Sequence, residues 1–218
     1  KINEDVVIPL PRMAEYTDGI ERINIELSLR NKLKLCDALT EFFERGNLPL
    51  GKHDADDEVP SPELLQDRVA QAIALVEEVR ALWQGWLHDV ETLFPQLQDH
   101  TLRASWKTQL RAPLQGIFTG AAFKPILDEA VAIHKRVLKG RVWVALHMHA
   151  GDGNVHTNIP VNSDDYEMLQ TAHEAVARIM VLARSLNGVI SGEHGIGITK
   201  LEFLTDDELR PFAEYKRK

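Results

Sequence analysis

Histidines gather in one short stretch of this chain, "HMHAGDGNVHTN", which runs from His147 to Asn158. His147 and His149 are two residues apart, so on a strand their side chains point to the same face. The sequence "GDGN" that follows them is typical of a tight turn between two strands. A chain that turns there brings His156 back towards His149, so the imidazoles can converge on one point.

A second stretch of the same kind is "SGEHGIG", in which Glu193 and His194 are adjacent and lie between glycines. Glycines let the backbone approach a ligand closely. Two imidazoles and one carboxylate are common protein ligands of a catalytic divalent metal ion. Histidines of the first stretch and Glu193 are therefore candidate ligands, and a further nearby histidine would be free to act as a base near neutral pH.

Structural interpretations of the same residues remain open. A buried histidine is often a hydrogen-bonded core residue, and histidines that alternate along a strand can line a solvated face. The sequence "GDGN" is also an ordinary hairpin turn. The remaining histidines are expected at the surface or in packing, and these are His53, His88, His100, His134 and His173.

Strand and helix patterns alternate around the two motifs. The hairpin needs strands over residues 141–149 and 155–161. Further strands are predicted at 6–8 and at the start of "VISGEHGIGITK", which leads into a glycine-rich loop. Apolar residues spaced by three and four predict a helix from Met13 to near Gly46, and another that Ser163 caps and Gly188 closes. This order predicts an α+β fold, an antiparallel sheet with helices on one face, formed by residues 1–50 and 141–218.

Residues 60–140 are predicted to form a helical insert. Ser61 and Pro62 are typical of a helix start. A polar linker, "GNLPLGKHDADDEVPSP", precedes them, and the helical stretch from about Leu102 to Leu138 is the expected packing partner. The apolar seam of the first helix has the four-three spacing of a coiled coil and comprises Leu65, Val69, Ala72, Val76, Val79, Trp83, Trp86 and Val90.

Composition narrows the class of protein. The chain has 218 residues and a net charge of -8, which argues against a nucleic-acid surface. Cys36 is the only cysteine, so a disulfide framework and a thiolate zinc site are excluded and a reducing, cytoplasmic compartment is favoured. No apolar run has transmembrane length. Because "KINEDVVIPL" already reads as a strand, we expect a piece of a longer protein.

The two motifs together resemble a known family. "HAGDGNVHTN" followed by "GVISGEHGIGITK" is similar to the C-terminal substrate domain of FAD-linked oxidases of the vanillyl-alcohol-oxidase type, which include D-lactate, glycolate and D-2-hydroxyglutarate dehydrogenases. "EDVVIPLPRMAEY" resembles the entry into the same domain. The insert and the segment "KINEDVVIPLPR" resemble most the large bacterial proteins that fuse an FAD-linked oxidase to an iron–sulfur module.

This resemblance implies a ferredoxin-like domain and a role for each matching residue. His149 and His156 match the family's metal-binding histidines, and Glu193 matches the carboxylate ligand. His194 matches the proposed general base, and Asn158 matches a polar residue beside the substrate.

One position departs from the family pattern. The family often has a lysine two residues before the aspartate of the first strand, where it meets a substrate carboxylate. Asn3 occupies that place here, and Lys1 lies two residues earlier. Lys1 is therefore the candidate for the substrate carboxylate.

The implied function is the oxidation of a D-2-hydroxy acid to the 2-oxo acid by an FAD-dependent dehydrogenase. FAD would be bound mainly by an upstream domain, the metal ion would be zinc, manganese or iron, and an iron–sulfur cluster would lie elsewhere in the parent protein. This chain alone is expected to be inactive. The resemblance implies a cytoplasmic protein, with peripheral attachment of the parent to the inner membrane as an alternative.

Two other classes of function are carried as alternatives. H-x-H motifs also occur in metal-dependent hydrolases with barrel folds, although there many strand–helix units follow the motif, and here little chain remains after His147. A non-catalytic interaction module built on residues 60–140, which docks an iron–sulfur partner, is the other alternative.

Overall fold

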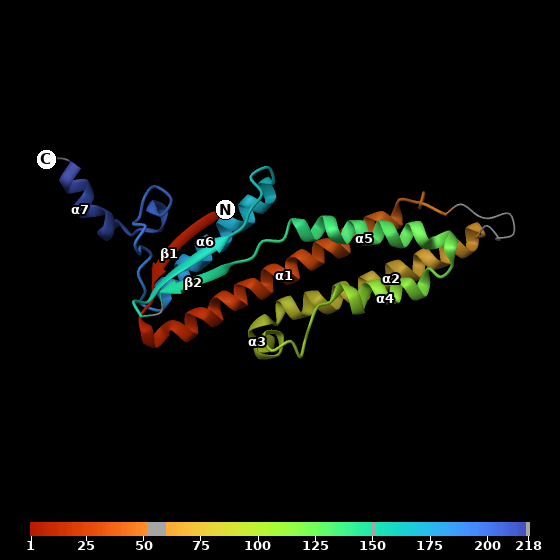
Figure 1. The fold of residues 1–218 in the computed structure, drawn as a ribbon, viewed down its shortest axis with the longest axis horizontal. Coiled ribbons are helices and arrows are strands. Elements are labelled where there is room, and N and C mark those ends of the chain that lie inside the picture. Colours follow the sequence, from red (N-terminus) through yellow and green to blue (C-terminus); the bar gives the residue numbers. More distant parts are fainter. Residues whose placement is uncertain (52–59, 150, 217–218) are drawn as a thin grey trace. The chain divides into compact units, whose positions relative to one another are not determined.

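The computed structural model describes residues 1–51, 60–149 and 151–216 and divides into two compact units (Figure 1). The first unit comprises residues 1–24 and 142–218, and the second comprises residues 25–141. Helix α1 (Met13–Glu44) begins in the first unit and ends in the second. Its later residues, among them Leu39 and Phe43, are buried in the core of the second unit.

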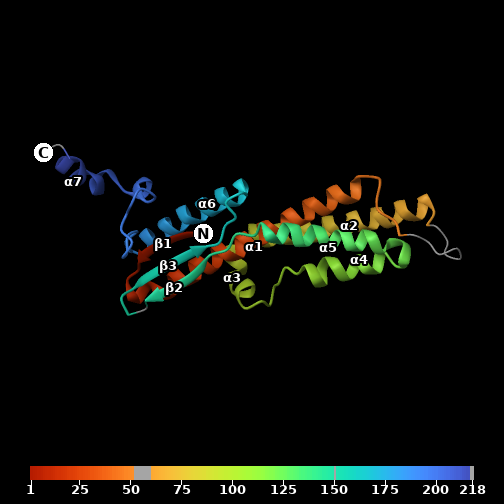
Figure 2. The same cartoon turned by 45° about the horizontal axis from the view of Figure 1, so that its top comes forward.

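The first unit contains an antiparallel sheet of three strands. They are β1 (Ile2–Val7), β2 (Ala145–His149) and β3 (Asn154–Ile159), and β3 lies between the other two (Figure 2). The α+β class and the hairpin of β2 and β3 confirm the sequence prediction. Strand β2 begins at Ala145 rather than Arg141.

The two faces of this sheet differ in character, because side chains alternate along each strand. One face carries Val6, Val155 and Ile159, all of them fully buried. The first part of α1 and helix α6 (Tyr166–Ser185) belong to the same unit and touch closely, since a Cβ atom on Gly19 would lie 2.5 Å from Leu182 Cδ2. The opposite face carries the histidines.

The ends of α6 correct two details of the sequence prediction. Asp165, rather than Ser163, is the N-cap, since its Oδ1 accepts a hydrogen bond of 2.9 Å from the Met168 N–H. The chain turns just before it, where the Asp165 N–H donates to the Asn162 carbonyl at 3.1 Å. At the other end the left-handed residue is Asn187, with φ 58°, and not Gly188.

The strand predicted at the start of "VISGEHGIGITK" is reduced to a single bridge, and the glycine-rich loop predicted after it is present. Val189 forms an isolated bridge with Val7, and the chain then continues in turns up to Lys200. Gly195 and Gly197 have φ values of 72° and 56°, which do not fit a strand. The segment ends in the short helix η4 (Leu201–Phe203) and in α7 (Asp206–Lys216).

The second unit is built from helices. Helix α2 (Pro62–His88) starts where it was predicted, with Ser61 Oγ accepting a hydrogen bond of 3.1 Å from the Leu64 N–H. It ends at His88, so Val90 belongs to a separate helix, α3 (Val90–Gln98). Residues 52–59 of the predicted linker before α2 lie outside the described residues.

The stretch after α3 is divided into several helical segments. It forms η2 (Trp106–Arg111), α4 (Ala112–Ile117), η3 (Ala121–Phe123) and α5 (Lys124–Lys139). The predicted seam of α2 is buried at Ala72, Val76, Val79 and Trp83 and contacts η2 and α4, as expected. In the described part of the chain, no helix has the length and apolar composition needed to span a bilayer.

Candidate functional site

The polar face of the sheet is organised around His156. In the register of the three strands, His156 pairs with Asp5 on β1 and with His147 on β2. Directly paired residues point to the same face, so the three side chains form a row across the sheet. His156 and Asp5 are buried, whereas His147 is exposed.

Three predicted metal ligands converge at one end of this row. The ligand atoms of His149, His156 and Glu193 all lie within 4.8 Å of one another. His156 Nε2 lies 2.9 Å from Glu193 Oε1, and the His149 and His156 ring centroids are 5.5 Å apart. Ligands of one tetrahedral zinc ion lie about 3.3 Å apart, given bonds of about 2.0–2.2 Å. The donor set therefore fits a divalent ion after small side-chain movements.

A second set of potential ligands, Asp5, His156 and His194, is also within 4.8 Å. Its carboxylate already has partners. Lys200 Nζ donates to Asp5 Oδ1 and to the Asp5 carbonyl, both at 2.7 Å, and the His194 N–H donates to Asp5 Oδ2 at 3.0 Å. The ammonium group of Lys200 supplies the positive charge that a metal ion would supply. The first set is therefore the stronger candidate for a metal site.

Asp5 holds the loop that carries Glu193 and His194. Burial raises the pKa of this carboxyl group, but the hydrogen bond from the His194 N–H and the charge of Lys200 lower it below its usual value. The carboxylate is thus ionised and bridges β1 to the loop. Gly192 is required at the contact, because a Cβ atom there would overlap the side-chain oxygens of Asp5 and Asn154.

His194 lies beside the metal ligands without a hydrogen bond that occupies its ring. Its ring centroid is 5.0 Å from that of His156. Its Nδ1 is 3.9 Å from Asp5 Oδ1, and its Nε2 is 3.9 Å from Glu193 Oε1. Both separations exceed hydrogen-bonding distance. Since the side chain is 42% exposed, the ring can reach a ligand and exchange a proton with it.

Two asparagine side chains on the same face have unpaired oxygens. Asn154 and Asn158 flank His156 at two-residue spacing on β3, and Oδ1 of each is buried and makes no hydrogen bond within the described residues. Buried polar atoms without a partner are rare in folded proteins. A ligand that lies over His156 could supply both oxygens with donors.

The predicted site residues thus fall into two groups. His149, His156, Glu193 and His194 come together, with Asn158 on the same face of the sheet. Lys1 is exposed just before β1, and within the described residues it forms no hydrogen bond or ion pair with the other predicted site residues.

Sequence reasoning missed the anchoring pair of Asp5 and Lys200. Lys200 is only 2% exposed, which is unusual for a lysine. A signal was present, because "NEDVV" places two acidic residues inside an apolar strand. Buried acids of this kind require a cationic partner, but the sequence pattern does not say which cation supplies it.

Comparison with known proteins identifies the part of the chain that carries the site. Residues 122–211 match the profile of the family described as FAD linked oxidases, C-terminal domain. No solved structure gives a significant match.

Several curated proteins are similar over short segments. The D-lactate dehydrogenase of Archaeoglobus fulgidus is 49% identical over 63 residues, 29% of this chain and 13% of that protein. The glycolate oxidase subunit GlcD of Bacillus subtilis is 33% identical over 79 residues, 36% of this chain and 17% of its own length. The mitochondrial D-lactate dehydrogenase [cytochrome] 1 of Saccharomyces cerevisiae is 28% identical over 102 residues, 47% of this chain and 16% of its own. The matched segments thus span less than a fifth of each relative.

Proposed function

We propose, on the premise that residues 122–211 belong to the C-terminal domain family of FAD linked oxidases, that this chain is the substrate- and metal-binding part of a flavin-dependent oxidoreductase. The substrate would be a D-2-hydroxy acid, which is oxidised to the 2-oxo acid. One observation carries the proposal. His149, His156 and Glu193 converge beside His194, whose ring nitrogens are not hydrogen-bonded to a carboxylate.

A divalent cation and FAD would take part in the oxidation of the substrate. A divalent cation such as zinc, manganese or iron supplies positive charge that lowers the pKa of a bound hydroxyl, and FAD supplies the acceptor of the C2 hydride. His149, His156 and Glu193 would hold the cation, since their donor atoms suit it.

The residues of this chain would position the substrate and move its proton. His194 takes the hydroxyl proton on a ring nitrogen, because neither nitrogen is hydrogen-bonded to a carboxylate. Asp5 and Lys200 keep the His194 backbone in place, which limits the motion of the ring. Fixing a base at its reacting atom removes much of the entropic cost of the step.

Substrate contacts are proposed for two further residues. Asn158 lies on the same face as His156, and its unpaired Oδ1 suits a donor on the substrate. Lys1 is proposed as the cation for the substrate carboxylate, since it is exposed near the start of β1. An upstream FAD-binding domain and an iron–sulfur module would complete a cytoplasmic parent enzyme.

Metal binding is tested by titrating this chain with zinc in a calorimeter. His149→Ala is expected to weaken binding at least about tenfold, because one donor of three is lost. The matched control is His173→Ala, since His173 is exposed on α6 and outside the cluster. Equal affinity in wild type and His149→Ala would contradict the proposed ligand set.

The catalytic role is tested in the full-length parent protein by following flavin reduction after rapid mixing with a D-2-hydroxy acid. His194→Ala is expected to slow reduction by about two to four orders of magnitude while the metal content stays unchanged. Glu193→Ala is expected to lose metal and rate together. Flavin reduction at the wild-type rate in His194→Ala would contradict the role of His194 as base.

A further inference from the structure

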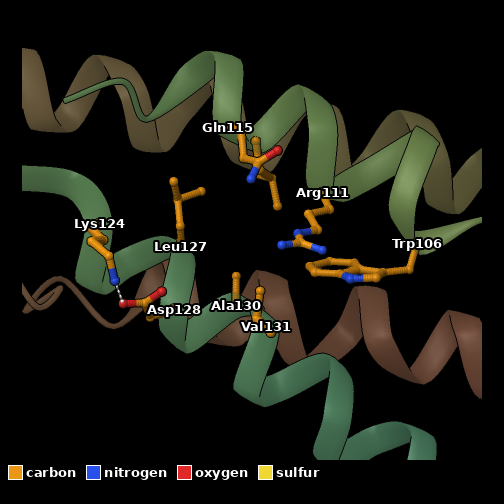
Figure 3. Close-up of a pocket in the computed structure, with 9 residues that line it drawn as sticks. Trp106, Arg111, Gln115, Lys124, Leu127, Asp128, Ala130 and Val131 are labelled. Carbon is orange, nitrogen blue, oxygen red and sulfur yellow. Dashed lines mark hydrogen bonds and ion pairs between the residues drawn. The ribbon is translucent and has the colours of Figure 1, made fainter. Parts of the chain in front are cut away.

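A separate cavity, mostly apolar with a few polar side chains, lies in the second unit, away from the histidine cluster in sequence. Its volume is about 190 Å³, and it lies among η2, α4 and α5 (Figure 3). The lining side chains come from Trp106, Arg111, Leu114, Gln115, Lys124, Leu127, Asp128, Ala130 and Val131. Four of these nine residues, including Trp106 and Arg111, precede the residues that match the oxidase family.

The helix that supplies two of these residues is of an unusual type. Segment η2 is a π-helix, in which the backbone N–H of Ala112 donates to the Lys107 carbonyl five residues earlier. Such turns are rare and frequently occur at functional sites. Five-residue spacing brings Trp106 and Arg111 to the same side, and Figure 3 shows the guanidinium group of Arg111 beside the Trp106 indole.

The π-helix is held in place by Gln109. Its Oε1 accepts a hydrogen bond of 3.1 Å from the indole N–H of the buried Trp83 and one of 2.7 Å from the Ser105 backbone N–H. The Trp106 ring also stacks on the His134 ring, with 4.7 Å between the ring centroids and an angle of 8° between the planes. The flat wall of the cavity is therefore fixed before any ligand arrives.

The charge of the cavity is positive. Lys124 pairs with Asp128 at 2.6 Å, so these two lining charges cancel. Arg111 forms no hydrogen bond or ion pair within the described residues. The remaining polar lining group is the amide of Gln115, one helical turn after Arg111.

Basic groups lie near this cavity. Burial lowers the pKa of His134, and the charges of Lys32 and Arg111 lower it further, which favours the neutral ring. Burial likewise lowers the pKa of Lys32, with further contributions from Arg141 and Arg103. The positive charge of the cavity therefore rests on Arg111.

We propose that this cavity binds a small organic anion in which one flat ring carries a carboxylate or phosphate group. The ring of the ligand packs against the Trp106 indole, and its anionic group pairs with Arg111. The planar guanidinium of Arg111 suits both a carboxylate and a phosphate. The volume limits the ligand to about one ring with its anionic substituent, since drug-sized pockets are about 300–1,000 Å³.

The test titrates the metal-free chain with benzoate and phenyl phosphate and follows the tryptophan indole N–H signals by nuclear magnetic resonance. Either ligand is expected to shift the Trp106 signal and leave that of Trp143 unchanged, and the tighter of the two identifies the anionic group. Benzamide, which lacks the charge, and acetate, which lacks the ring, are expected to bind at least tenfold more weakly.

The deciding variant is Arg111→Gln, which is expected to weaken binding at least tenfold while the circular dichroism spectrum stays unchanged. Lys107→Gln is the matched control, because Lys107 lies on the same π-helix but does not line the cavity, and its binding is expected to stay within twofold of wild type. The proposal is overturned if neither ring-bearing anion shifts Trp106, if acetate or benzamide binds equally well, or if the two variants weaken binding alike.

Discussion

Lys200 is a buried cation whose ammonium group contacts Asp5 twice at 2.7 Å and lies 3.6 Å from Glu4 Oε2. Its side chain is 2% exposed and that of Asp5 is 0% exposed, so solvent screens this pair little. Removal of one partner from such a pair leaves an uncompensated charge in the interior, which is a large penalty.

Lys200→Met is therefore expected to lower the free energy of unfolding by about 3 kcal/mol or more at neutral pH. Asp5→Asn should also destabilise, but the double variant should be more stable than the sum of the two effects implies, by about 1–3 kcal/mol. Urea unfolding of all four proteins measures this coupling. Strict additivity would show that the pair does not act as a unit.

The same carboxylate gives the acid stability of the chain a specific dependence on pH. The folded pKa of Asp5 is lower than its usual value of 3.8, so between the two values the folded state binds fewer protons than the unfolded state. The stabilisation that the Asp5 carboxylate provides is therefore complete above about pH 4, and it is lost as the pH drops through the folded pKa.

Asp5→Asn is expected to flatten this decline in unfolding free energy, measured by urea titration between about pH 2.5 and 5. Asp164→Asn is the control, because Asp164 is exposed in the turn before α6. If the unfolding free energy of both variants declines with falling pH as steeply as that of the wild type, Asp5 does not contribute to the loss of stability in acid.

At the scale of the element, helix α2 shows how a periodic pattern becomes a packed surface. Its seam residue Val76 is fully buried, and the same face is continued by Trp83. Around them lie α1, η2, α4 and α5, all of which contribute to the same hydrophobic core. The stability of the second unit therefore depends on this face of α2.

Val76→Asp is expected to destabilise the chain by at least about 3 kcal/mol, since an unpaired carboxylate would be buried among apolar side chains. Ala74→Asp places the same side chain on the exposed side of α2 and should cost less than about 1 kcal/mol. Thermal and urea unfolding measure both. Similar losses in the two variants would contradict the burial of the seam.

At the scale of the whole molecule, the C-terminal helix contributes little to the described structure. Helix α7 has no buried residue, and Glu208 on this helix forms an ion pair with Arg184 of α6 at 2.9 Å. Exposed ion pairs contribute less than about 1 kcal/mol. By contrast, the segment before it supplies the buried Lys200.

Truncation after Thr205 is therefore expected to leave the unfolding free energy within about 1 kcal/mol of the intact chain. Truncation after Thr199 also removes Lys200 and should cost about 3 kcal/mol or more. Comparing the two shortened chains by urea unfolding separates these contributions. Equal stability of both would show that Lys200 does not anchor β1.

Much of the secondary structure could be predicted from the sequence because its determinants are local. The seam of α2, the Ser61 cap and the hairpin around "GDGN" each depend on residues within a few positions of one another. The convergence of His149 and His156 could be predicted for the same reason, since both lie on that hairpin. The family resemblance was also carried by contiguous motifs.

Only the tertiary structure decided how Asp5 is used. Its partner Lys200 is 195 residues away in sequence, and no periodic pattern links the two. The path of the glycine-rich loop after Val189 was decided in the same way, because the His194 N–H donates to the Asp5 carboxylate while Gly195 and Gly197 adopt positive φ values. Long-range polar contacts of this kind depend on which chain segments meet, whereas local periodicity records only which residues are buried.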